Sequence, residues 1–163
     1  MSTGNERGAA LIVALIFLVV LTLLGVGAMR TTNLQERMAG SLRDSNLAFQ
    51  AAESALREGE QMLQQAALPV FAGTGGLLQM QPDAGQPSFW NTYAWAGNSM
   101  AAAAVAGTAA APQYVIEELP PVPLQGGSLR FGALPEVGFY RVTARAVGGT
   151  TDAVSLLQIA YRR

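Results

Sequence analysis

An uninterrupted apolar run from Ala9 to Met29 is the feature that most constrains how this chain can fold. Its 21 residues carry no charge. As an α-helix the run would be about 31 Å long, which matches a bilayer hydrocarbon core of about 30 Å. The apolar region of a secretory signal is shorter, at about 7 to 15 residues, and follows a clearly basic leader. The run therefore predicts a membrane-spanning helix.

The flanks of this run leave two questions open. The small residues Val26-Gly27-Ala28 would suit a signal peptidase, so ordinary cleavage before Met29 remains an alternative, although the leader holds both Glu6 and Arg7 and is only weakly basic. Arg7 and Arg30 stand one on each side of the run. Because the positive charges are balanced, they do not determine the orientation in the membrane.

A helical pattern continues well beyond the apolar run. Apolar and small residues recur in steps of three and four from Leu34 to Ala66, and no proline lies between Gly27 and Leu68. This predicts one helix of more than fifty residues, with an amphipathic second half. Ordinary globular helices have about 11 to 12 residues, so another element or an assembly must cover this one. A coiled-coil stalk is the alternative, but the stripe keeps no sustained heptad.

The composition argues against catalysis and against nucleic acid binding. The chain has no cysteine and no histidine, which removes the commonest zinc ligands and the nucleophile and base pairs built on them. Ten basic residues, all arginine, nearly balance eleven acidic ones. Glu117 and Glu118 are adjacent, so on a strand they point to opposite faces and form no carboxylate pair. We therefore predict no enzymatic activity, no catalytic residue, no cofactor, no metal site and no nucleic acid partner.

The junction Arg7-Gly8-Ala9, followed at once by the apolar helix, resembles the N-terminus of a type IV prepilin. In that family a prepilin peptidase cuts directly after the glycine and then methylates the new terminal amine. The resemblance implies cleavage between Gly8 and Ala9 and N-methylation of Ala9. The apolar run would then stay in the mature protein as anchor and as assembly element.

The segment after the apolar run resembles the N-terminal domain of the PilX minor pilins, and the resemblance covers Arg7 to Glu60. It implies the pilin architecture, an α+β fold in which a long N-terminal helix packs on a small antiparallel sheet. The matching residues are Glu36, Arg37, Met38, Ala39, Gly40, Arg43 and Asp44, then Ala48, Phe49, Gln50, Ala51, Ala52 and Glu53, and finally Ala55 and Leu56.

Val13 departs from the usual pilin pattern. Most pilins carry glutamate as the fifth residue after the cut, where it pairs with the terminal amine of a neighbouring subunit. A carboxylate at the bilayer centre costs at least about 2.5 kcal/mol, so it needs such a partner. The secretion pseudopilin GspK, which PilX resembles, also lacks this acid and is interpreted as a tip subunit. The resemblance implies an initiator or tip subunit here, and an ordinary apolar anchor residue is the alternative.

The region after the helix is rich in glycine and proline and reads as loop. It holds an aromatic cluster of Phe89, Trp90, Tyr93 and Trp95. Core packing against the long helix is the favoured interpretation of this cluster, and a surface for a partner is the other. The alanine-rich tract 100–111 has the composition of a short helix, although Gly107 and Thr108 interrupt it, and disorder is the alternative.

Three strands are predicted near the C-terminus, at 114–119, 138–147 and 153–161. Alternation in the second strand predicts one buried and one solvent-exposed face, with the buried face on helix residues 48–66. Glycines and threonines at 148–152 predict a hairpin turn, and the prolines of 119–123 are expected to end the first strand. Without cysteine the chain cannot form the C-terminal disulfide common in pilins, so strand pairing must hold its end.

The predicted organisation is a leader at 1–8, a transmembrane half-helix at 9–29, an amphipathic half-helix at 30–66, a variable loop region at 67–112 and a sheet at 113–163. The resemblance implies a minor pilin that primes pilus assembly for twitching motility and adhesion. It would lie in the inner membrane with its C-terminal domain in the periplasm, and later at the pilus tip.

The resemblance also implies partners. They are other minor pilins and the major pilin through the N-terminal helix, the prepilin peptidase and the membrane, with a large tip adhesin as a further candidate. Two other functions remain as alternatives. They are a type II secretion pseudopilin of the GspK type and a single-pass membrane-anchored adaptor.

Overall fold

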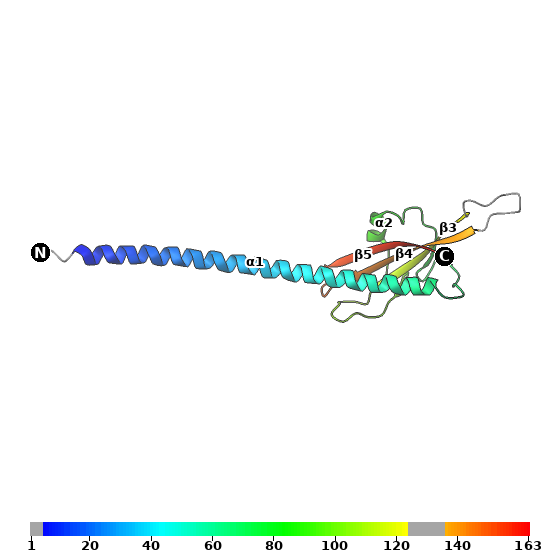
Figure 1. Ribbon diagram of the computed structural model, residues 1–163, viewed down its shortest axis with the longest axis horizontal. Helices are drawn as coiled ribbons and strands as arrows, with labels where there is room; N and C mark the ends of the chain where they lie inside the picture. The colour runs from blue at the N-terminus through cyan, green and yellow to red at the C-terminus, as the bar shows by residue number, and fades with distance from the viewer. Residues whose placement is uncertain (1–4, 124–135) are drawn as a thin grey trace. The chain divides into compact units, whose positions relative to one another are not determined.

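The computed structural model describes residues 5–123 and 136–163. Residues 1–4 of the predicted leader and residues 124–135 of the predicted sheet region lie outside the described residues. The chain divides into two compact units at the boundary between Leu42 and Arg43. A long N-terminal helix and a small, mostly antiparallel sheet confirm the predicted α+β, pilin-like fold (Figure 1).

Helix α1 runs from Asn5 to Leu63 and contains no proline. In the second unit its buried face is made of small residues, chiefly alanines from Ala48 to Ala55. Gly59 continues this face, and a Cβ at that position would lie only 2.6 Å from Cγ1 of Val142. The helix therefore approaches the sheet as closely as its backbone allows.

The sheet contains five strands and is antiparallel along its long members. The three long strands pair in the order β3, β4, β5, and β1 and β2 both pair with β3, β1 in parallel and β2 antiparallel. A short helix, α2, precedes β2. The bounds are β1 Leu77–Gln79, α2 Pro87–Thr92, β2 Met100–Ala101, β3 Gln113–Pro123, β4 Glu136–Val147 and β5 Val154–Arg162.

Two local predictions were wrong. The alanine-rich tract forms no helix, because it starts as β2 and the N–H of Ala102 donates to the carbonyl of Pro112. The prolines do not end β3, which resumes pairing with β4 at Val122 and Val137 after a register shift that follows Leu119. A strand tolerates proline at irregularities and along edges, where no ladder hydrogen bond is lost.

The face of the sheet toward α1 carries the main apolar core. Tyr114, Ile116 and Val142 pack there against Leu56 and Leu63 of the helix. Leu157, Ile159 and Tyr161 of β5 extend the same layer. The prediction that the apolar face of the sheet lies on the second half of the helix is confirmed.

The opposite face was predicted to be exposed to solvent, and this was wrong. The segment with α2 folds over it, so that the sheet lies between α1 and α2 (Figure 1). Trp90 and Trp95 pack on Val115 and Leu156, which point away from α1. The strand alternation was predicted correctly, but it carried no information about a second covering layer.

Candidate functional site

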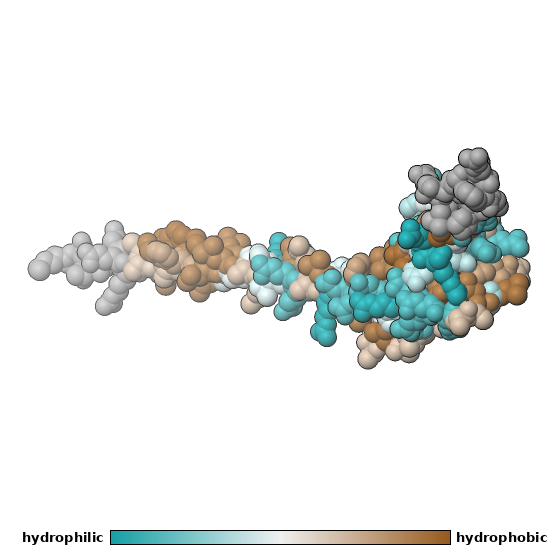
Figure 2. Space-filling view, turned by 45° about the vertical axis from the view of Figure 1, so that its right-hand side comes forward, coloured by the Kyte–Doolittle hydropathy of each residue, from teal (hydrophilic) through white to brown (hydrophobic). Residues whose placement is uncertain are grey.

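The first half of α1 presents apolar side chains all around its axis. Leu11, Phe17 and Leu24 are all more than half exposed, and Figure 2 shows the apolar residues gathered along this part of the helix. Within the described residues one helix, α1, is long and apolar enough to cross a membrane. A patch of this size needs lipid or protein around it. Val13 lies in this surface and adds no charge to it.

The motif residues Glu36, Arg37 and Gly40 lie on exposed helix in the first unit. A Cβ at Gly40 would meet nothing within 4 Å. Leu34, Met38 and Leu42 follow at intervals of four, which places them on one side of the helix, and all three are exposed. This apolar side is open in the isolated chain.

Asp44 joins α1 to the turn between β4 and β5. Its Oδ1 accepts hydrogen bonds from the N–H groups of Gly149 and Thr150, the second at 3.2 Å, and its Oδ2 accepts one from the Thr150 hydroxyl. The turn fits closely, because any Cβ at Gly148 would overlap the Asp44 side chain. The carbonyl of Gly148 in turn accepts the N–H of Ala109. The helix and the hairpin turn thus meet at one carboxylate, and the loop after β2 is bonded to the same turn.

These contacts lower the pKa of Asp44. The hydrogen bond from the Thr150 hydroxyl contributes most, the backbone N–H groups of Thr150 and Gly149 add to it, and partial desolvation opposes it. All three hydrogen bonds favour the charged carboxylate. Asp44 is therefore ionised at neutral pH and acts as an acceptor for the turn.

The remaining motif residues, Arg43, Phe49 and Glu53, lie along α1 away from the buried alanine face. Glu53 Oε2 lies 3.7 Å from Nη2 of Arg57, an ion pair between residues four apart on the helix. Glu58 Oε1 accepts the N–H of Ala103 at 2.7 Å and holds the loop after β2 beside the helix.

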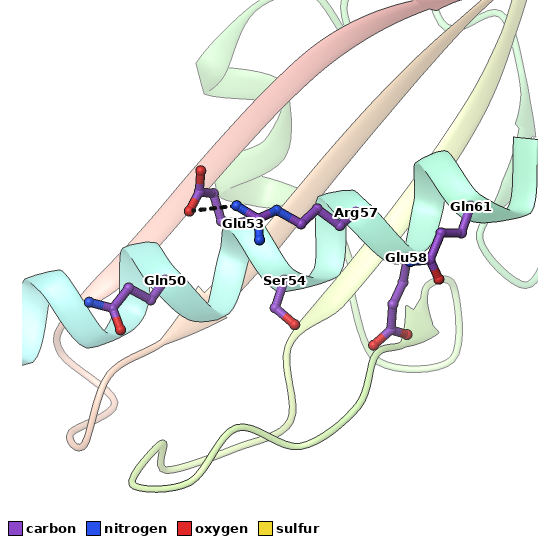
Figure 3. A pocket seen from close by; sticks show the side chains of 6 residues that line it. All are labelled: Gln50, Glu53, Ser54, Arg57, Glu58 and Gln61. Carbon is purple, nitrogen blue, oxygen red and sulfur yellow. Dashed lines mark ion pairs between the residues drawn. The ribbon is translucent and has the colours of Figure 1, made fainter.

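A polar groove of about 490 Å³ follows this side of the helix (Figure 3). It is open to solvent, and its arginine is already paired with Glu53. The groove therefore offers a polar contact surface rather than an enclosed binding site. Its lining residues are Gln50, Glu53, Ser54, Arg57, Glu58 and Gln61.

The aromatic cluster is part of the core on the far side of the sheet. Trp90 is 3 % exposed and its Nε1 donates to the carbonyl of Ala84 at 2.8 Å, and the buried Trp95 donates to the carbonyl of Trp90. Core packing is thus confirmed for both tryptophans, but the predicted contact with the long helix was wrong. Phe89 and Tyr93 are half-buried and form the part of the cluster that is open to solvent.

A buried ion pair lies under this aromatic segment. Glu117 is 1 % exposed, and its Oε2 lies 3.4 Å from Nη1 of Arg141, the residue directly opposite on β4. Its Oε1 accepts the N–H of Gln81. Burial raises the pKa of Glu117, while the Gln81 hydrogen bond and the Arg141 charge oppose the rise. Glu118, the next residue, is exposed on the other face, as predicted.

The polar layer continues on β4 and β5. Gln158 Nε2 donates to the Thr143 hydroxyl at 2.8 Å and to the carbonyl of Ala84 at 2.9 Å, which ties the covering segment to the sheet. In the part of the chain that the structure describes, no group of three or more acidic residues is placed to hold a metal ion.

This buried layer and the contacts of Asp44 were not predicted from the sequence. A signal was present for the ion pair, because an acid and an arginine occupy neighbouring predicted strands and such cross-strand pairs are common. For Asp44 there was none, since its partners lie 105 and 106 residues away along the chain.

Two family models match the chain. The PilX N-terminal model matches residues 7–57, and the model described as type IV pilus assembly protein PilX C-term matches residues 44–163. The second covers well over half of the chain, and Asp44 lies in the overlap. Searches of curated proteins and of solved structures gave no match.

Proposed function

The chain belongs to the PilX family of type IV pilus assembly proteins, and on that premise we propose that it is a minor pilin that primes assembly from the filament tip. The proposal combines three features: the junction at Gly8 and Ala9, the apolar first half of α1, and the apolar residue at position 13. Before assembly, the globular unit of the protein lies in the periplasm and its apolar helix lies in the inner membrane as an anchor.

Processing is proposed to occur between Gly8 and Ala9. The prepilin peptidase removes residues 1–8 and methylates the amine of Ala9, and residues 9–29 stay in the membrane. Support comes from the continuity of α1 through this junction and from the span of apolar residues that follows it. The mature helix then passes from lipid into a bundle of other pilin helices without changing its apolar surface.

Val13 is the observation that carries the tip position. A subunit inside the filament needs an acid at this place to pair with the amine of the subunit ahead of it. Valine cannot form that pair, and a subunit with nothing ahead of it has no use for the acid. An apolar residue also avoids the cost of about 2.5 kcal/mol or more for a carboxylate in the bilayer.

The exposed parts of the motif helix are the proposed contacts with other minor pilins. The apolar side formed by Leu34, Met38 and Leu42 is open in the isolated chain, as expected for a surface that packs only in an assembly. Phe89 and Tyr93 are the proposed contact for a tip adhesin, because their rings are half exposed above the buried tryptophans.

The first experiment is the intact mass and N-terminal sequence of the protein from membranes, with and without the prepilin peptidase. We expect a chain that begins at methylated Ala9 and that is lost when the peptidase is absent. A chain that keeps Met1 would leave an anchored adaptor as its function. One that begins at Met29 would be an ordinary secreted protein.

The second experiment tests the tip position through Val13→Glu, with Val13→Leu as the matched control. Immunogold labelling should find the unaltered protein and the leucine variant at filament ends. The glutamate variant gains the missing acid, so label should also occur along the shaft. Label along the shaft for the unaltered protein would contradict the tip position, and loss of type II secretion rather than of pili in a deletion strain would indicate a pseudopilin.

A further inference from the structure

The two edges of the sheet are built differently. One edge is formed by β1 and β2, of three and two residues, which pair with only part of β3. The rest of β3 on that side contains Pro120, Pro121 and Pro123. Short edge strands and prolines are the usual means by which proteins prevent unwanted strand pairing. The other edge is β5, with nine residues in unbroken register against β4.

The hydrogen bonds show which backbone groups of β5 point outward. The N–H of Arg163 donates to Gly138 and the N–H of Gly148 donates to Ala153, so the odd-numbered residues of β5 face β4. In an antiparallel pair the intervening residues direct their N–H and C=O groups away from the partner strand. Within the described residues, none of these outward groups takes part in a hydrogen bond. They belong to Val154, Leu156, Gln158, Ala160 and Arg162.

None of the usual protective features is present along this edge. Strand β5 contains no proline and no bulge, and its only charged side chain is Arg162 at the end. A long, regular and nearly uncharged edge strand is a template for another strand. Its persistence in a protein whose opposite edge is blunted indicates a use for it.

We infer that β5 is a docking edge that accepts an extended segment of a different protein as a sixth strand of the sheet. Backbone hydrogen bonds along the outward groups of β5 would hold the segment, and side-chain contacts would select it. Next to Leu157, Ile159 and Tyr161 the incoming strand needs apolar residues at every second position. An acidic residue of the incoming strand beside Arg162 would add an ion pair to these contacts.

A second copy of β5 fits this edge less well than a segment of another protein. Strand β5 contains no acidic residue, so a second β5 paired with it would bring no counter-charge to Arg162. Cross-links between two copies would therefore contradict the inference.

The test uses the full chain in its own cells, with a photo-reactive benzoylphenylalanine in place of Val154 or Ala160, one at a time. Both side chains are exposed. We expect cross-links to one segment of one other protein, at two sites about six residues apart, the spacing of Val154 and Ala160. The same probe at Met38 reports the proposed helix contacts independently, so loss of cross-links from β5 alone would refute the docking edge and leave the pilin role standing.

Substitution of Ala160 makes the test specific for the backbone. The N–H group that Ala160→Pro removes makes no hydrogen bond in the isolated sheet. Ala160→Ser keeps this N–H group. The cross-link from Val154 should fall at least about tenfold with proline and stay with serine, because proline excludes a paired neighbour strand. Ala160→Asp serves in place of proline if that variant does not fold. Equal cross-linking in all variants, scattered sites, no cross-link, or cross-links between two copies of β5 would each overturn the inference.

Discussion

On one face of the sheet a regular helix covers apolar strand residues mainly with alanines and a glycine, and on the other face an irregular segment with two tryptophans covers both apolar and polar residues. Small residues suffice on α1 because its backbone comes within contact distance of Val142. The α2 segment lies over Glu117 and Thr143 and needs large rings to fill the space. It also needs hydrogen bonds to satisfy the groups that it buries.

The two faces should therefore respond to different substitutions. On the α1 face, added volume destabilises the fold, because two backbones already approach closely. On the α2 face, removed volume or a removed charge partner destabilises it, because the cover depends on a few large or paired side chains.

Replacement of Trp90 by alanine should cost most. The buried indole fills the space above Val115 and donates to Ala84, so its loss should lower the free energy of unfolding by about 4 kcal/mol. Denaturant unfolding of the full chain in detergent measures this. Phe89→Ala is the matched control with a half-buried ring, and a larger loss for Phe89 than for Trp90 would contradict the assignment of the core.

Removal of Glu117 should rank next. Glu117→Ala leaves the Arg141 guanidinium, whose side chain is 21 % exposed, without its partner, and should cost about 3 kcal/mol in the same assay. Glu117→Gln keeps an oxygen that accepts the Gln81 N–H, so its loss at neutral pH should be smaller. Equal losses for both variants would show that the Gln81 contact has no effect.

The raised pKa of Glu117 also sets a pH dependence. A carboxyl with a raised pKa in the folded state contributes stability that is complete below its ordinary value of 4.5 and is lost as the pH rises through the folded pKa. The Gln variant lacks this contribution. The difference in unfolding free energy between the two proteins should therefore change above pH 4.5, and a constant difference would contradict the raised pKa.

Added volume at Gly59 is the third prediction. Gly59→Ala should lower the free energy of unfolding by about 1 kcal/mol. The clash with Val142 costs more than the gain in helix propensity, which is itself about 1 kcal/mol. In the Val142→Ala background the same change should be neutral or stabilising. A double-mutant cycle without coupling would show that the helix can move away from the sheet.

The smallest global effect is expected for Asp44, the one carboxylate that fixes α1 to the β4–β5 turn. Asp44→Ala should speed hydrogen exchange at the N–H groups of Gly149 and Thr150, with Arg43→Ala as the control. Since its pKa is lowered, the stabilising effect of Asp44 is present above pH 3.8 and is lost as the pH falls through the folded value. Unchanged exchange of the turn would contradict this role.

Periodicity in the sequence predicted the long helix, the three main strands and the apolar contact between them. These elements depend on local patterns with repeats of 3.6 and 2 residues. Patterns of this kind do not report which segment covers a second face, so the burial of Thr143 was missed. Strand β3 through its prolines was missed for a similar reason, because the pairing of Val122 depends on an extra residue in β3 between Leu119 and Val122.

The proposed processing and assembly residues differ from the buried ones in how they were found. Gly8, Ala9 and Val13 were identified by resemblance, which implies that a peptidase or a neighbouring subunit acts on them. Asp44 belongs to the same motif, yet the structure gives it contacts within the chain. A motif read from sequence alone does not separate these two kinds of residue.

The attachment of α1 also has a mechanical side. Contacts between the helix and the rest of its unit extend from Asp44 to Leu63, about 30 Å along the axis. A pull on the helix along that axis loads these contacts in shear, so that they resist together rather than opening one after another. Under such tension the lifetime of the unit is set by its unfolding rate, and that rate depends on all of these contacts at once.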